Sequence, residues 1–176
     1  VGLRAPAVFS WVAGRPAGPA LRAQLVPGLW GGVAGAAWLW LLSRLAPAAL
    51  QPSDPDNAMP LAVKLLYGGI TEELLMRWGV MTLLLWLGWR LLQRGHGQPR
   101  KGLVATAVLL SAVLFAVGHL PAAQAMAGVL TMPVVAFVLV GNTVFGLVAG
   151  GLFARHGLEA AIIAHVLAHL LASPLL

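Results

Sequence analysis

Long and nearly continuous apolar segments are the feature that most limits how this chain can fold. The 176 residues are 60% hydrophobic and only 9% charged, whereas a soluble domain has about 25% charged residues. The apolar segments are too long to be the one-sided stripes of surface helices. We therefore expect an integral membrane protein folded as one all-α, polytopic transmembrane helical bundle.

About five spans are expected, with short interfacial helices beside them. The spans lie at about residues 25–45, 71–92, 102–120, 133–153 and 158–171. The apolar stretch 61–92 would be about 48 Å long as one helix, which exceeds a hydrocarbon core of about 30 Å. We expect it to break at Gly68-Gly69, giving a short interfacial helix before the span. A second short interfacial or re-entrant helix is expected within residues 122–131.

The domain organisation is simple. Residues 1–24 are expected to form an N-terminal juxtamembrane segment, and residues 25–176 the helical domain. Prolines and glycines interrupt residues 6–19 before a hydrophobic region of normal length forms, so no cleavable signal peptide is expected. The chain starts without Met, which suggests that upstream spans are missing.

The net charge of +6 indicates membrane topology rather than nucleic-acid binding. The basic residues flank the apolar segments instead of forming one stripe. They are Arg4, Arg15 and Arg22 before the first span and Arg90, Arg94, Arg100 and Lys101 around the loop after the second. The positive-inside bias then places the N-terminus, residues 93–101 and Arg155 inside, and the acidic loop 47–60 outside. We expect a bacterial inner (cytoplasmic) membrane.

Two adjacent glutamates and an arginine lie inside an apolar segment, where ionisable residues are costly and usually functional. Glu73 and Arg77 are four residues apart in the favoured orientation, so the guanidinium can neutralise Glu73. Glu72 points about 100° around the helix axis and remains free. A desolvated carboxylate is a good proton acceptor, which makes Glu72 the candidate general base. A buried ion network that fixes helix register, or the lining of an ion pathway, would use the same residues.

Three histidines also lie in apolar segments or at their ends. By itself, His119 beside Pro121 is more typical of an interfacial histidine than of a ligand. His165 and His169 are four residues apart and therefore share one helix face. Such a pair can ligate a metal or present two donors to one substrate atom. Backbone carbonyls of neighbouring helices would satisfy the same two rings.

Three segments in this order resemble motifs of one family. Glu72–Arg77, Phe115–His119 and His165–His169 resemble the EExxxR, FxxxH and HxxxN motifs of the CPBP intramembrane proteases. That family includes the type II CAAX prenyl endoproteases and the bacterial abortive-infection membrane proteins. The resemblance covers about residues 67–171.

The resemblance implies an all-helical membrane protease in which Glu72 and His119 activate a water molecule for attack on a peptide carbonyl. Glu73 and Arg77 would hold the site together. His165 and the last motif position, here His169, would stabilise the oxyanion, which requires preorganised donors in a water-poor site.

The last motif position departs from the family pattern, which has asparagine or another small polar residue where this chain has His169. A histidine with a proton on Nε2 can still donate to an oxyanion. A third imidazole beside Glu72, His119 and His165 also makes a zinc site easier to build. A glutamate-type protease needs no cofactor and a metallo-type protease needs zinc, and the sequence leaves that choice open.

The expected partner is a membrane-embedded or lipid-anchored peptide or protein, met in the lipid bilayer. A non-catalytic scaffold or sorting partner with the same fold is the alternative. A proton-relay transporter ranks last, because no inverted repeat stands out in the sequence. Charge counting places Glu72 and His119 toward the outer half of the membrane and His165 toward its middle or inner part. The sequence does not indicate an oligomeric state.

Overall fold

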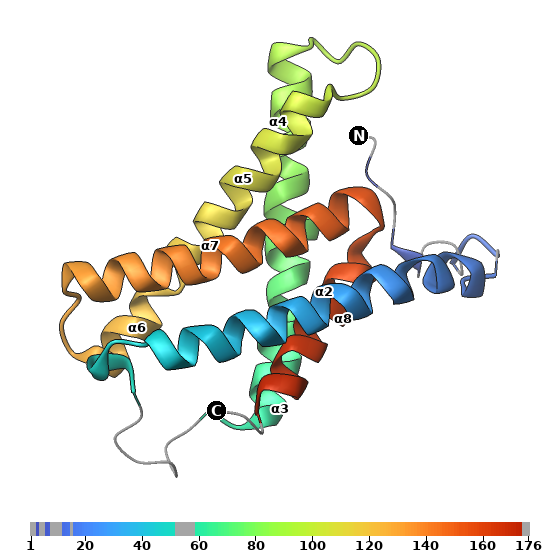
Figure 1. Ribbon diagram of the computed structural model, residues 1–176. Helices are drawn as coiled ribbons and strands as arrows, with labels where there is room; N and C mark the ends of the chain where they lie inside the picture. The colour runs from blue at the N-terminus through green and yellow to red at the C-terminus, as the bar shows by residue number, and fades with distance from the viewer. Residues whose placement is uncertain (1–2, 4–5, 8–11, 15, 52–58, 174–176) are drawn as a thin grey trace.

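A computed structural model describes residues 3, 6–7, 12–14, 16–51 and 59–173, and every regular element within them is helical (Figure 1). The elements are α2 (Gly18–Leu45), η1 (Ala48–Leu50), α3 (Leu61–Val63), η3 (Lys64–Thr71), η4 (Leu74–Met81), α4 (Thr82–Leu92), α5 (Lys101–Gly118), α6 (Leu120–Ala127), α7 (Met132–Arg155) and α8 (Leu158–Ala172). The expected all-α helical bundle is confirmed. The acidic part of the expected outer loop, with Asp54 and Asp56, lies outside the described residues, as do Arg4 and Arg15.

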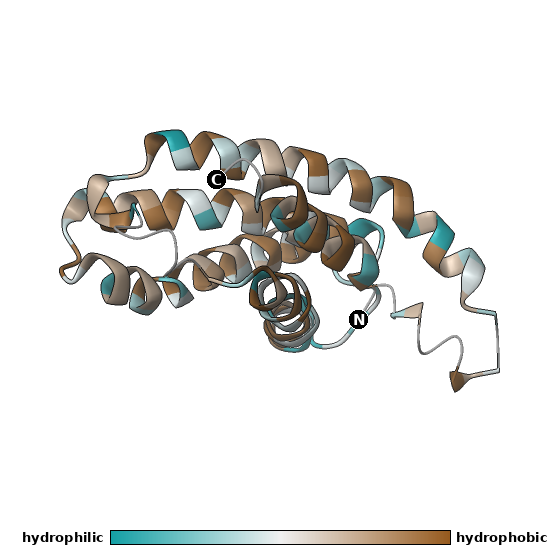
Figure 2. Cartoon of the chain, turned by 90° about the horizontal axis from the view of Figure 1, so that it is seen from below, coloured by the Kyte–Doolittle hydropathy of each residue, from teal (hydrophilic) through white to brown (hydrophobic). Residues whose placement is uncertain are grey.

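Three helical segments are long and apolar enough to cross a membrane. They are α2, the segment Lys101–Ala127 formed by α5 and α6, and α7. Large apolar side chains on these helices are exposed, among them Trp30 and Met132 at 72% and 78%. Figure 2 shows hydrophobic residues, in brown, along the helices. A soluble monomer rarely exposes so much contiguous apolar surface. The chain is an integral membrane protein.

The two other expected spans do not meet the same criterion of length and apolar composition. Helix α8 is apolar but only 15 residues long. The helix over residues 61–92 includes the glutamates and the arginine. It also runs across α2 and α7 in Figure 1 rather than alongside them.

The expected break at Gly68-Gly69 is wrong, because residues 61–92 form one continuous helix. Two stretches of it, η3 and η4, are π-helical, and Glu72 and Glu73 lie between them. The hydroxyl of Thr71 donates to the carbonyl of Leu66, five residues earlier, at 3.1 Å. The helix therefore changes its winding at the glycine pair instead of stopping there. Single π turns inside α-helices are frequent at functional sites.

Helix α2 starts at Gly18, ahead of the expected start of the span at Leu25. Pro19 causes no break, because a proline in the first helical turn removes only an N–H that has no helical partner. Gln24, on this early part of α2, is buried and bonds the first turn of α8. The additional turns of α2 therefore contribute to tertiary packing.

The remaining helices were expected at nearly their observed positions. Helix α5 ends at Gly118, α6 follows immediately, and Gly128, with φ of 72°, ends α6. Helix α2 packs along α8, and α5 packs along α7. The main apolar core lies where the helix over 61–92 meets α5, α7 and α8, and contains Met81, Phe115 and Phe153. This core surrounds the ionisable side chains.

Candidate active site

A fully buried ion pair stands at the centre of the site. Glu73 and Arg77 are both 0% exposed, and Nε of Arg77 lies 3.2 Å from Oε2 of Glu73. The pairing predicted from the i,i+4 spacing is confirmed. Nδ1 of His165, on α8, lies 2.8 Å from the other carboxylate oxygen of Glu73. Glu73 therefore joins its own helix to α8.

Arg77 also contacts residues of α5 and α7. It donates from Nη2 to the carbonyl of Gly146 on α7 at 3.4 Å, and its Cζ lies 4.7 Å from the ring centroid of Phe115. A Cβ at Gly146 would lie 2.9 Å from Cα of Ala112, so only glycine allows α5 and α7 to approach this closely. Nη1 of Arg77 has no hydrogen-bond partner among the described residues. The aromatic face of Phe115 offsets part of that cost.

Glu72 and His119 form a second, more accessible pair. Their side chains are 17% and 31% exposed, and Nε2 of His119 lies 3.8 Å from Oε1 of Glu72. The other ring nitrogen, Nδ1, lies 2.8 Å from the carbonyl oxygen of Phe115. Because a carbonyl only accepts, this hydrogen bond assigns the proton to Nδ1 and leaves Nε2 of the neutral ring as an acceptor facing Glu72.

The fold explains how His119 reaches Glu72. His119 is the residue at which α5 ends and α6 begins, and Pro121 lies in the first turn of α6. Its ring packs edge-on against Phe115 one turn earlier, with centroids 4.5 Å apart. The histidine is therefore fixed at a helix junction, turned toward the 61–92 helix.

His165 and His169 stack on one face of α8, as their spacing predicted. Their ring centroids are 5.0 Å apart, with 23° between the planes. The ring of Phe145 on α7 lies 4.5 Å from that of His165, and the ring of Phe115 lies 6.1 Å away. The aromatic rings and the bond to Glu73 fix the orientation of His165.

The structure brings all six candidate residues into one region, where contacts join them in two groups. One links Glu73, Arg77 and His165, and the other links Glu72 and His119. His169 joins the first through His165. His165 contacts Glu73, the residue adjacent to Glu72, so the structure brings together residues that charge counting expected at different depths.

Several contributors to the site were not predicted. The bond from His165 to Glu73, the ring of Phe145 and the carbonyl of Gly146 depend on tertiary packing. The sequence did indicate close helix contacts at Gly68 and Gly146, because small residues in apolar helices mark positions where helices approach closely.

The candidate metal ligands were Glu72, His119, His165 and His169. In the part of the chain that the structure describes, no group of three or more His, Cys, Asp or Glu side chains is arranged to hold a metal ion. Nδ1 of His119 and Nδ1 of His165 bond oxygen acceptors, which leaves Nε2 of each ring as the nitrogen that could ligate, but these side chains do not converge in a group of three. The residues as placed do not fit a three-ligand zinc site.

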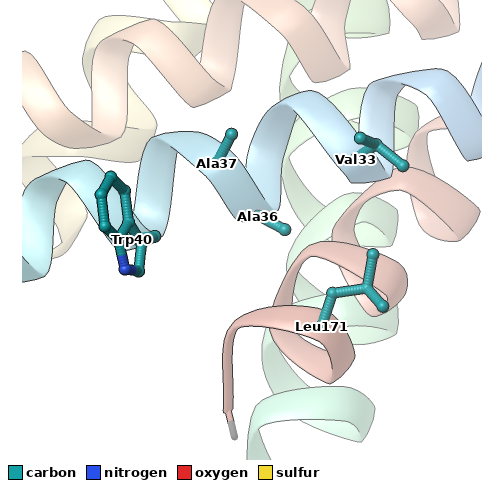
Figure 3. A pocket seen from close by; sticks show the side chains of 5 residues that line it. All are labelled: Val33, Ala36, Ala37, Trp40 and Leu171. Atoms are coloured by element: carbon teal, nitrogen blue, oxygen red, sulfur yellow. The ribbon is translucent and has the colours of Figure 1, made fainter. Parts of the chain in front are cut away.

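An apolar hollow of about 430 Å³ lies away from these residues, between α2 and the end of α8 (Figure 3). It is lined by Val33, Ala36, Ala37, Trp40 and Leu171. None of its lining residues is ionisable, so it has no catalytic group of its own.

The fold and these contacts define a helical membrane protein with a buried glutamate–arginine–histidine cluster beside an accessible glutamate–histidine pair. Residues 54–171, more than half of the chain, match the family of Rce1-like type II CAAX prenyl endopeptidases, and the chain belongs to that family. The comparisons with curated proteins and with solved structures found no match. At the level of the family, the chain is a CAAX-type intramembrane protease, which is a peptidase.

Proposed function

We propose that this chain is an endopeptidase that hydrolyses a peptide bond of a membrane-associated substrate, with Glu72 and His119 activating the attacking water. The separation between Nε2 of His119 and Oε1 of Glu72, 3.8 Å, is the observation that carries the proposal. It is too long for a direct hydrogen bond but suits two acceptors bridged by one water molecule. Such a water donates one proton to each acceptor and directs a lone pair outward.

The chemistry follows from this arrangement. The water oxygen forms a bond to the carbonyl carbon, the π electrons of the carbonyl move to its oxygen, and one water proton passes to Glu72. The oxyanion then re-forms the C=O bond as the C–N bond breaks. Glu72 returns its proton to the departing nitrogen, so the products are a carboxylic acid and an amine.

His165 and His169 are proposed to stabilise the oxyanion. A proton on Nε2 of His169 can be donated to it directly. Nδ1 of His165 donates to Glu73, so His165 donates from Nε2 only as an imidazolium, for which Glu73 is the counter-ion. Glu73 and Arg77 are positioning residues in this scheme, because they are fully buried. Preorganised donors of this kind contribute about 10²- to 10³-fold in kcat.

We propose a glutamate-type mechanism without a metal, and no step above uses one. The absence of a three-ligand group among the described residues supports this choice. The proposed substrate is a membrane-embedded or lipid-anchored peptide or protein, and the proposed location is the bacterial inner membrane. The exposed apolar side chains, such as those of Trp30 and Met132, support access from the bilayer.

The test is cleavage of a membrane-tethered peptide library by purified wild type and Glu72→Gln, each with and without a zinc chelator. Glu72→Gln keeps the shape of the side chain and removes its basicity, so we expect cleavage to fall by at least about 100-fold. Glu159→Gln is the matched control, because Glu159 lies in the first turn of α8 and bonds Gln24 outside the site. Equal cleavage by wild type and Glu72→Gln would refute the assignment. Cleavage by neither protein would favour the scaffold alternative.

A further inference from the structure

The hollow between α2 and α8 forms beyond the last glycine of α2. Glycines of α2 allow close contact with α8, and a Cβ at Gly32 would lie only 2.6 Å from Cβ of Leu167. One at Gly35 would lie 2.9 Å from Cβ of Ala168. After Gly35, α2 continues with larger side chains. The apolar hollow of about 430 Å³ opens here, between α2 and Leu171 near the end of α8 (Figure 3).

The size and lining of the hollow suit a hydrocarbon chain. Its volume falls within the range of about 300–1,000 Å³ that is usual for sites of small ligands. The lining runs along α2 from Val33 to Trp40, a length of about 10 Å. Helix α2 is apolar and long enough to cross a membrane, and Val33, Trp40 and Leu171 are all exposed. A chain from the bilayer can therefore lie in the hollow.

A cation lies beside one end of the hollow. Arg44, in the last turn of α2, is exposed, and its Cζ lies 5.2 Å from the centroid of the ring of Trp40. The ring of Trp40 thus contacts the guanidinium and also lines the apolar space. Within the described part of the chain, Arg44 forms no hydrogen bond or ion pair. Its five N–H donors are unused there.

Membrane topology does not account for this cation. The basic residues that indicate the inner side lie before α2, around the loop after α4 and at the end of α7, whereas Arg44 precedes the loop that charge counting places outside. Trp and Arg at the end of a membrane-crossing helix are expected at the level of the lipid headgroups. At that level, a phosphate matches the planar fork of donors of a guanidinium.

We propose that the hollow and Arg44 together bind one anionic phospholipid, with an acyl chain against Val33, Ala37 and Leu171 and the phosphate on the guanidinium of Arg44. Charge complementarity favours an anionic headgroup, because a zwitterionic lipid adds a second cation beside Arg44. The bound lipid contacts both α2 and the last turn of α8, so it stabilises the folded protein. This inference does not depend on the proposed catalysis.

The experiment measures Tm of the purified chain in detergent micelles with one of three additions. These are phosphatidylglycerol, phosphatidylcholine with the same acyl chains, and inorganic phosphate. We expect saturating phosphatidylglycerol to raise Tm by about 3 °C more than phosphatidylcholine. Inorganic phosphate should leave Tm unchanged, because it has no chain to fill the hollow. An equal rise with the two lipids, or the same rise with phosphate alone, would overturn the proposal.

Two variants test the two ends of the site separately. Arg44→Gln should weaken the apparent Kd for phosphatidylglycerol by about tenfold. Arg22→Gln is the matched control, because it removes an exposed arginine near the start of the same helix. Ala37→Phe fills the hollow and should weaken binding of both lipids, whereas Ala23→Phe, at an exposed position outside the hollow, should not. If either variant binds phosphatidylglycerol as its control does, the proposal is wrong.

Discussion

Nδ1 of His165 lies 2.8 Å from Oε1 of Glu73, and the other oxygen of the same carboxylate faces Arg77. One buried carboxylate thus connects a charge on its own helix with a ring on α8. This division leaves Glu72, the adjacent residue, without a strong partner. Glu73 therefore contributes to the stability of the fold, and the neighbouring Glu72 is left for the proposed chemistry.

Removing the buried carboxylate should destabilise the protein. Glu73→Ala leaves Arg77 buried without its counter-ion, which typically costs about 3–5 kcal/mol. Denaturant unfolding in detergent micelles measures this loss. Glu72→Gln serves as the comparison, since its partly exposed side chain forms no direct hydrogen bond with His119. Equal stability of Glu73→Ala and the wild type would contradict the described ion pair.

The two members of the ion pair should be energetically coupled. Glu73→Leu and Arg77→Leu should each be strongly destabilising, whereas the double variant leaves neither member of this pair buried alone and costs only the bond from His165 to Glu73 in addition. We expect the loss in the double variant to be smaller than the sum of the single losses by more than about 1 kcal/mol. Additive losses in a double-mutant cycle would show that the residues do not interact.

Removing metal should leave cleavage unchanged. Prolonged dialysis against a zinc chelator is expected to change kcat less than twofold, because the described residues form no three-ligand group. A soluble zinc protease treated in the same buffer shows whether chelation was complete. Loss of cleavage that added zinc restores would refute the glutamate-type mechanism and require a rearrangement of His119, His165 or His169.

Gln24 should stabilise the start of α8. Its amide oxygen accepts from the backbone N–H of Ala160 at 3.1 Å, and its amide nitrogen donates to Glu159 at 2.8 Å. Glu159 also accepts from the backbone N–H of Ala7. Gln24→Leu leaves the buried N–H of Ala160 without its partner, at about 1–3 kcal/mol, and removes one of the two donors to Glu159.

Gln51→Leu is the matched control for Gln24→Leu, because Gln51 is exposed and, among the residues that the structure describes, its side chain bonds only the carbonyl of Ala46. Hydrogen exchange at the first turn of α8, together with unfolding, distinguishes the two variants. Faster exchange only in Gln24→Leu is expected. Equal behaviour of the two variants would show that the buried glutamine contributes nothing to α8.

The sequence predicted what depends on local periodicity. Apolar composition located α5, α7 and α8, and the four-residue spacings predicted both the Glu73–Arg77 pair and the shared face of His165 and His169. The sequence did not predict what depends on contacts between helices. The bond between Glu73 and His165 joins residues 92 positions apart.

The pair Gly68-Gly69 also shows that local sequence does not predict contacts between helices. Adjacent glycines weaken an isolated helix, and on that basis a break was expected. In the folded protein, α8 packs directly on Gly69, so the same residues permit tertiary contact that keeps the helix continuous. Propensity alone does not distinguish a hinge from a packing site.

The π-helical stretch Lys64–Thr71 makes the number of residues before Glu72 as important as their identity. A π turn contains an additional residue compared with an α turn. Deleting one residue can therefore be absorbed by converting a π turn into an α turn, whereas an insertion cannot be absorbed in this way. This segment should tolerate many exchanges of its apolar side chains, and one deletion better than one insertion.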